Sequence, residues 1–167
     1  MIKIGITGSL ASGKTTASRI LSYKNGPLFS ADKIVKELYK RKHINDLIRK
    51  KLRINKKDNV KKSVKKMILE DLKNISKIEK IIHPLIRKRM KSFTSKHKNK
   101  KLLFYEIPLL IESKLMNFFD LIIFVKSKKK TRLKRFKSKK GEEKLFNILN
   151  NKQMNDKKKV KYCDHVV

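Results

Sequence analysis

The feature that most constrains the fold is a glycine-punctuated loop that follows a β-branched run at residues 2–6 and precedes a helix-compatible run at residues 17–21. The letters GITGSLASGKTT contain the spacing G-x-x-x-x-G-K-[ST]. The residues that define this spacing are Gly8, Gly13, Lys14 and Thr15. Because strand, loop and helix follow in the order that this motif requires, the sequence predicts a phosphate-binding loop.

Each residue type in this loop has a chemical task. Backbone N–H groups turn inward toward a phosphate chain only where side chains are small or absent, and the N-terminus of the following helix adds positive potential. We therefore expect Lys14 to bridge the outer phosphates of a nucleotide and the Thr15 hydroxyl to coordinate the Mg²⁺ that the nucleotide carries. The full set expected to bind ATP through its phosphates is Gly8, Ala11, Ser12, Gly13, Lys14, Thr15 and Thr16.

Four further apolar runs have the length of a strand. They are residues 27–32, 101–106, 120–126 and 163–167. The second and third of these runs are almost continuously apolar, which is typical of strands that are covered on both faces. Helix-compatible segments between the runs are residues 33–40, 127–140 and 142–153. Strands that alternate with helices indicate an α/β fold with a five-stranded parallel sheet, in the three-layer arrangement of P-loop NTPases.

Between the second and third predicted strands, residues 44–97 read as consecutive amphipathic helices. Pro84 stands where a new helix can begin, because proline is well tolerated in a first helical turn. We therefore expect a single domain with a helical insertion and a short cationic lid. Its expected parts are a core at about 1–40 and 100–167, the insertion at about 41–99 and the lid at about 127–140.

Lysine dominates the composition, and the formal net charge is +33 at pH 7. A basic surface attracts nucleic acid through the phosphate backbone. However, only eight of the 47 basic residues are arginine, and the lysines are spread along the whole chain between periodic apolar residues. With 39% hydrophobic residues, the chain has enough apolar side chains for a folded core. We expect a solvated lysine surface and no specific nucleic-acid partner, with another anionic partner as the open alternative.

Cysteine usage and apolar content bear on where the chain works. Cys163 is the single cysteine, so an internal disulfide is impossible. The first residues lack the apolar run of a signal peptide, and the longest apolar runs are far shorter than the roughly 20 residues of a membrane-spanning helix. We expect a cytoplasmic monomer without membrane contact.

Charged side chains at strand ends and on the polar helix are candidates for further chemistry. Asp32 stands at the end of the second predicted strand. It is a candidate general base for an acceptor hydroxyl, and the alternative is a plain helix cap. Glu106 ends another predicted strand. It is a candidate Walker-B-type carboxylate that holds the water shell of the metal, and the alternative is a charged residue that only terminates the strand. Arg132 and Arg135 belong to a cationic lid or to a solvated helix face. His83 is a lone histidine, for which a structural role at a helix junction is the commoner one.

Five short segments together resemble the dephospho-CoA kinase family. They are GITGSLASGKTT, SAD, IIHPLIR, EIPLLIE and RLKR, in this order, and the resemblance runs from residue 2 to the end. The segments HPLIR and IPLLIE are the most specific, because they are not general features of phosphate-loop proteins. The resemblance implies the last step of coenzyme A synthesis, in which the γ-phosphoryl of ATP passes to the ribose 3′-hydroxyl of dephospho-CoA with Mg²⁺ as cofactor.

The same resemblance assigns roles to individual residues. It implies that Asp32 is the general base and Arg135 the lid arginine, which together with Lys14 make up the catalytic set. It implies that Glu106 acts on the metal through water, beside Thr15. It also implies that the helical insertion at about 41–99 binds the substrate. The residues implied in binding the acceptor are Asp32, His83, Pro84, Glu106 and Leu110.

The chain departs from the family pattern at several positions. Ser30 stands where the family has the first aspartate of an Asp-x-Asp motif, and Ser9 and Ala11 stand where it usually has glycine. The sequence ends at Val167, whereas the family continues into an Asn-containing turn. The resemblance implies that this turn helps to hold the adenine. Because the loop, the base and the lid arginine are all retained, we expect an active enzyme.

Two other functions remain open from the sequence. One is another phosphate-loop kinase that acts on a nucleoside or nucleotide, and the segments HPLIR and IPLLIE argue against it. The other is a basic RNA- or DNA-binding protein with a vestigial loop. That protein would bind nucleic acid tightly and with a steep salt dependence, whereas a kinase with a lysine-rich surface would bind it weakly.

Overall fold

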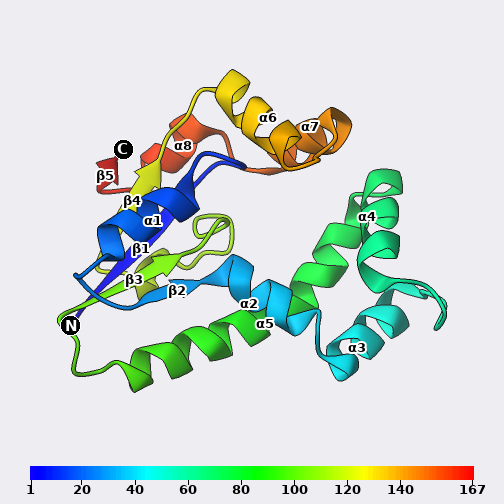
Figure 1. Cartoon of the computed structure of the whole chain (residues 1–167), viewed down its shortest axis with the longest axis horizontal. Coiled ribbons are helices and arrows are strands. Elements are labelled where there is room, and N and C mark those ends of the chain that lie inside the picture. The colour runs from blue at the N-terminus through cyan, green and yellow to red at the C-terminus, as the bar shows by residue number, and fades with distance from the viewer. The chain divides into compact units, whose positions relative to one another are not determined.

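The structure is a computed structural model that describes all 167 residues. The chain forms two compact units (Figure 1). The α/β unit comprises Met1–Ala31 and Thr94–Val167, and the helical unit comprises Asp32–Phe93. The helical unit therefore begins directly after the second strand, earlier in the chain than the insertion expected at about residue 41. None of the helices combines the length and the apolar composition that crossing a membrane requires.

The α/β unit is built on a five-stranded parallel sheet, as the sequence predicts. The strands are β1 (Ile2–Gly8), β2 (Leu28–Ser30), β3 (Leu102–Glu106), β4 (Leu121–Val125) and β5 (His165–Val166). Their order across the sheet is β2-β3-β1-β4-β5, and every neighbouring pair is parallel. The carboxyl ends of the strands therefore share one edge, which is where ligands of open α/β sheets bind.

Apolar residues on both faces of the central strands form the core of this unit. On one face, Ile6, Phe104 and Ile123 pack together, and Ala17 and Leu21 of helix α1 (Lys14–Ser22) cover them. Side chains alternate along a strand, so the residues between these point to the opposite face. There the buried ring of Tyr105 contacts Phe29, Phe118 and Phe119. Burial of each large apolar side chain stabilises the fold by roughly 1.5–3 kcal/mol.

Three helices follow β4 in the α/β unit. They are α6 (Lys129–Ser138), α7 (Glu143–Lys152) and α8 (Asp156–Val160), while a short 3₁₀ helix, η1 (Met116–Phe118), precedes β4. Helix α8 was not predicted from the sequence, because its residues, DKKKV, show no apolar periodicity. Its start is set instead by Asn155, whose side chain accepts a hydrogen bond from the Lys157 backbone N–H at 2.8 Å.

The helical unit contains the predicted amphipathic helices, with two corrections. Its helices are α2 (Ala31–Leu38), α3 (Lys42–Leu52), α4 (Val60–Glu70) and α5 (Lys73–Lys96), of which α2 starts and α5 ends in the α/β unit. Asp32 lies in the first turn of α2 and not at a strand end, because β2 stops at Ser30. Pro84 lies inside α5 and does not begin a helix. The apolar stripe that includes Ile82 and Ile86 runs on both sides of Pro84, which outweighs the one backbone hydrogen bond that proline removes.

Candidate functional site

The phosphate loop connects β1 to α1 at the carboxyl edge of the sheet. Two of its glycines have positive φ, 152° at Gly8 and 106° at Gly13. A Cβ on Gly8 would lie 2.5 Å from the carbonyl oxygen of Val125, and one on Gly13 would lie 3.2 Å from Nη1 of Arg135. Glycine at both positions is therefore required by the backbone conformation and by close neighbours.

Lys14 and Ser12 give the loop its polar interior. The Lys14 side chain is only 7% exposed, and its Nζ donates to the carbonyl oxygens of Gly8 at 3.0 Å and Ser9 at 2.8 Å. These carbonyls satisfy a buried ammonium group that would otherwise be costly to bury. The Ser12 hydroxyl is buried without any hydrogen-bond partner in the protein. A buried ammonium and an unpaired hydroxyl inside a loop of backbone amides fit a phosphate ligand.

Glu106 joins the phosphate loop to the end of β2. Its side chain is 1% exposed. Oε1 accepts a hydrogen bond from the Thr15 hydroxyl at 2.5 Å, and Oε2 accepts one from the Ser30 hydroxyl at 2.8 Å. The register of the sheet makes this possible, because Ser30 on β2 pairs with Glu106 on β3. The structure thus brings together the two residues that were predicted to act on the metal.

Ser30 is a site residue that the sequence analysis treated only as a lost carboxylate. In the structure its hydroxyl is the second donor to Glu106, so it belongs to the same cluster. The sequence offered only part of the signal for it. Ser30 lies in the predicted strand at residues 27–32 and Glu106 ends the predicted strand at residues 101–106, but the pairing of these two strands is seen only in the structure.

The two arginines of α6 have different environments. Nη1 of Arg135 donates to the carbonyl oxygen of Ser12 at 2.8 Å, so this exposed side chain reaches the phosphate loop. Arg132 is only 5% exposed and donates to the Asn150 side chain at 2.7 Å and to the Ser127 carbonyl at 3.1 Å. Arg132 also donates to the Leu10 carbonyl of the loop at 3.4 Å. It is therefore a buried arginine with several partners, whereas Arg135 is an exposed arginine that reaches the loop.

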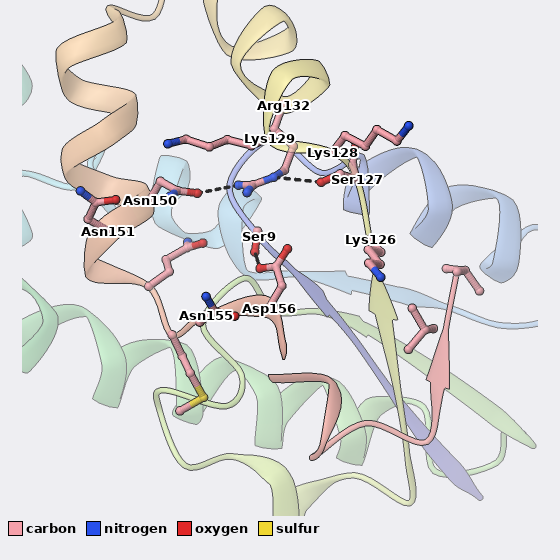
Figure 2. Close-up of a pocket in the computed structure, with 14 residues that line it drawn as sticks. Ser9, Lys126, Ser127, Lys128, Lys129, Arg132, Asn150, Asn151, Asn155 and Asp156 are labelled. Atoms are coloured by element: carbon pink, nitrogen blue, oxygen red, sulfur yellow. Dashed lines mark hydrogen bonds between the residues drawn. The ribbon is translucent and has the colours of Figure 1, made fainter. Parts of the chain in front are cut away.

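A pocket of about 850 Å³ adjoins the phosphate loop at Ser9 (Figure 2). Its walls come from the β4–α6 connection, the α7–α8 connection and the end of β5. Besides Ser9, its polar lining residues are Lys126, Ser127, Lys128, Lys129, Arg132, Asn150, Asn151, Gln153, Asn155 and Asp156. This pocket was not predicted from the sequence. Its lysines and asparagines form no motif, and such residues are equally common on a solvated surface.

Three of the predicted acceptor-binding residues belong to the helical unit. They are Asp32, His83 and Pro84, of which Asp32 and Pro84 are exposed. Burial lowers the pKa of His83 below its usual value, Glu79 on α5 opposes this shift, and a weaker effect of Arg87 adds to it. Their roles toward an acceptor stay predictions.

Leu110, also predicted to bind the acceptor, is a core residue of the α/β unit. It is 0% exposed, and a Cβ added at Gly5 would lie 2.7 Å from its Cδ1. Its contact with an acceptor also stays a prediction.

No three His, Cys, Asp or Glu side chains are grouped so that they could hold a metal ion by themselves. A metal at this site would therefore depend on hydroxyl, water and ligand oxygens.

Comparison with known proteins identifies the family. The family model described as dephospho-CoA kinase matches residues 2–167. A dephospho-CoA kinase of Bartonella quintana is 35% identical over 171 residues, which cover 98% of this chain and 87% of the relative. One of Rickettsia typhi is 37% identical over 135 residues, covering 81% of this chain and 70% of the relative.

A solved structure supports the same fold. The dephospho-CoA kinase of Campylobacter jejuni superposes with a TM-score of 0.64 at 24% identity, covering 99% of this chain and 86% of that one. With a family match over nearly the whole sequence, the chain belongs to the dephospho-CoA kinase family.

Proposed function

We propose that this protein transfers the γ-phosphoryl group of Mg-ATP to the ribose 3′-hydroxyl of dephospho-CoA, the last step of coenzyme A synthesis. The observation that carries the proposal is the cluster at the carboxyl edge of the sheet. There Glu106 holds Thr15 of the phosphate loop, while Lys14 and Arg135 approach the same loop with their cationic groups. Positioning and charge stabilisation are what phosphoryl transfer chiefly requires from a protein.

The cations of the loop would bind the nucleotide by exchanging partners. Lys14 donates to the carbonyls of Gly8 and Ser9, and Arg135 donates to the carbonyl of Ser12. Phosphate oxygens carry full negative charge and make stronger, charge-assisted hydrogen bonds than these carbonyls do. We expect both side chains to turn to the phosphates when ATP binds, and Arg135 to stabilise the charge on the group in transfer.

The magnesium ion would be held by Thr15 and, through water, by Glu106. The Thr15 hydroxyl directs its proton to Glu106, which leaves its oxygen lone pairs available to a cation. Mg²⁺ prefers oxygen ligands and keeps several waters, in agreement with a site that offers one hydroxyl and one nearby carboxylate. When bound, the ion would neutralise charge on the phosphates of ATP.

Asp32 would take the proton from the acceptor. It is an exposed carboxylate in the first turn of α2, directly after the strand whose last residue, Ser30, is bonded to Glu106. As the 3′-oxygen of dephospho-CoA forms its bond to the γ-phosphorus, the bond to the β–γ bridging oxygen breaks and ADP leaves. The proton of the hydroxyl passes to Asp32.

The pocket beside Ser9 would take the nucleoside part of ATP. It opens next to the phosphate loop, so a nucleotide whose phosphates lie in the loop can extend into it. Its volume of about 850 Å³ is within the range of small-molecule sites. Its lining side chains are mainly amides and lysines, which offer hydrogen-bond donors to a purine ring and a ribose.

A coupled assay of ADP release with Mg-ATP tests the proposal. The acceptors are dephospho-CoA and, in parallel, a panel of nucleosides. We expect turnover with dephospho-CoA alone, and a loss of about 100-fold or more in kcat for Asp32→Asn, which cannot accept the proton. The exposed Asp58→Asn is the matched control. Turnover with a nucleoside but not with dephospho-CoA would contradict the proposed acceptor, and no turnover despite ATP binding would contradict the kinase activity.

A further inference from the structure

The connection between α7 and α8 is bonded to the front half of the phosphate loop. The side chain of Asp156 accepts a hydrogen bond from the hydroxyl of Ser9, and Figure 2 shows the two side chains facing each other. Three residues earlier, Oε1 of Gln153 accepts a hydrogen bond from the backbone N–H of Leu10 at 3.0 Å. Two consecutive loop residues are therefore held by one short segment that lies more than a hundred residues away in the chain.

The loop needs support from outside because its backbone is strained. Ala11 has a φ of 58°, in the left-handed region that residues with a Cβ rarely adopt. Such a conformation is unfavourable for a residue with a Cβ, and it persists where the surrounding structure holds it. Ser9 and Leu10, which are bonded to Asp156 and Gln153, directly precede Ala11. These bonds hold the strained turn on its N-terminal side.

The need for this support increases when a nucleotide binds. Lys14 now donates to the carbonyls of Gly8 and Ser9 and so holds the loop from within. On the proposed function, the Lys14 ammonium moves to the phosphates and these two bonds are lost. The hydrogen bond between Ser9 and Asp156 does not involve Lys14, so it remains when the ammonium leaves.

The α7–α8 connection is itself fixed on its other side. Oε1 of Glu112 accepts a hydrogen bond from the Met154 backbone N–H at 3.2 Å and lies 2.8 Å from Nζ of Lys159. Lys159 is 0% exposed, so this ion pair is shielded from solvent on the lysine side. Asp156 thus lies between two residues that are both bonded to Glu112, and its carboxylate is held in place opposite Ser9.

We infer that Asp156 is a positioning residue for nucleotide binding, acting through the hydroxyl of Ser9 to keep the phosphate loop in its binding shape. It does not touch the reacting atoms. The inference rests on the proposed use of the loop for ATP. It assigns to a residue of the pocket wall a function in phosphate binding, and it predicts that the affinity for nucleotide, not the affinity for the acceptor, depends on the Ser9–Asp156 pair.

The test measures the affinity for Mg-ATP and Mg-ADP by titration calorimetry for Asp156→Ala, Ser9→Ala and the double variant. We expect each single variant to bind about five-fold more weakly, as for one lost hydrogen bond, and the double variant to bind no more weakly than either. Asp156→Asn keeps an acceptor oxygen and should restore most of the affinity. Lys158→Ala, an exposed change on the same helix, is the control.

Steady-state kinetics give a second readout that a merely structural role would not move. The KM for ATP should rise in parallel with the dissociation constant, while the KM for dephospho-CoA stays unchanged and kcat changes by less than about two-fold. Ser9→Ala leaves α8 untouched, so it carries the test even where Asp156→Ala lowers the yield of folded protein.

Two results would overturn the inference while leaving the proposed function intact. One is unchanged nucleotide affinity in Ser9→Ala, and the other is a double variant whose loss is the product of the two single losses. Failure of the unmodified protein to bind nucleotide at all would be a different result. It would contradict the proposed function, and the inference with it.

Discussion

At the scale of single residues, Glu106 has the most concentrated set of contacts at the site. One buried carboxylate accepts hydrogen bonds from Thr15 on the phosphate loop and from Ser30 on the neighbouring strand. A buried carboxylate needs such donors, because burial of an unpartnered charge is strongly unfavourable. The sequence was sufficient to predict Thr15 and Glu106, which carry motif positions. It was not sufficient for Ser30, whose role depends on the pairing of two strands.

The charge of Glu106 can be separated from its hydrogen bonds by substitution. Glu106→Gln keeps the shape and one acceptor oxygen, so we expect a loss of about 100-fold in kcat from the missing negative charge near the metal. Ser30→Ala removes a single hydrogen bond, so its effect on the free energy of unfolding should be about 1 kcal/mol and its effect on kcat below about ten-fold. Steady-state kinetics at saturating Mg-ATP measure both. Equal kcat values for the two variants would show that the charge is not used.

His83 gives the stability of the protein a pH dependence of known sign. Burial lowers its pKa, so the unfolded chain binds a proton at His83 more readily than the folded chain does. Stability should therefore fall as the pH drops through 6.5, the ordinary pKa of histidine, and level off below the lowered pKa of the folded state. Urea unfolding between pH 8 and pH 5 measures the free energy of unfolding of the unmodified protein and of His83→Gln. The unmodified protein should lose stability as the pH falls, and the variant should not show this loss. His43→Gln, an exposed change on α3, is the control, and an identical pH profile for His83→Gln would contradict the assignment.

At the scale of elements, the sequence predicted those whose apolar pattern is unambiguous. β3 and β4 were predicted because both of their faces are buried, which leaves a continuous apolar run. α8 was missed because it is lysine-rich and is fixed by the Asn155 cap and the contact of Lys159 with Glu112. Those contacts join segments that are distant in sequence, and no local pattern reports them. The expected helix start at Pro84 was wrong, because a local rule for proline ignored the apolar stripe of α5.

We expect the two arginines of helix α6 to differ, with Arg132 serving stability and Arg135 serving the reaction. Arg132 is buried and bonded to Ser127 and Asn150, so Arg132→Ala should lower the free energy of unfolding by about 3 kcal/mol. Arg135 is exposed and donates to the Ser12 carbonyl at 2.8 Å and, more weakly, to the Ser127 hydroxyl at 3.4 Å. Arg135→Ala should therefore change stability by less than about 1 kcal/mol and lower kcat about 100-fold. Denaturant unfolding and kinetics on the same samples separate the two effects. The reverse assignment, with stability lost in Arg135→Ala, would contradict this division.

At the scale of the whole molecule, the five-stranded parallel sheet and the family were both predicted from the sequence and confirmed, whereas the order of the strands was found in the structure. The pocket beside Ser9 was not predicted, because four separate segments of the chain, of which Ser9 lies more than a hundred residues from the others, form its walls. The charge of +33 is distributed over the chain and does not define a site by itself. Its expected effect is a faster encounter with anionic substrates such as ATP and dephospho-CoA, with a rate that falls as salt increases.

The central claim is that the phosphoryl group passes to the 3′-hydroxyl of dephospho-CoA, and identification of the product tests it most directly. Phosphorus NMR of the reaction with Mg-ATP should show one new phosphomonoester, coupled to the ribose 3′-proton. An analogue of dephospho-CoA that lacks the 3′-hydroxyl should give none. Phosphate on any other oxygen, or transfer to the 3′-deoxy analogue, would contradict the account of this protein as a kinase of that hydroxyl.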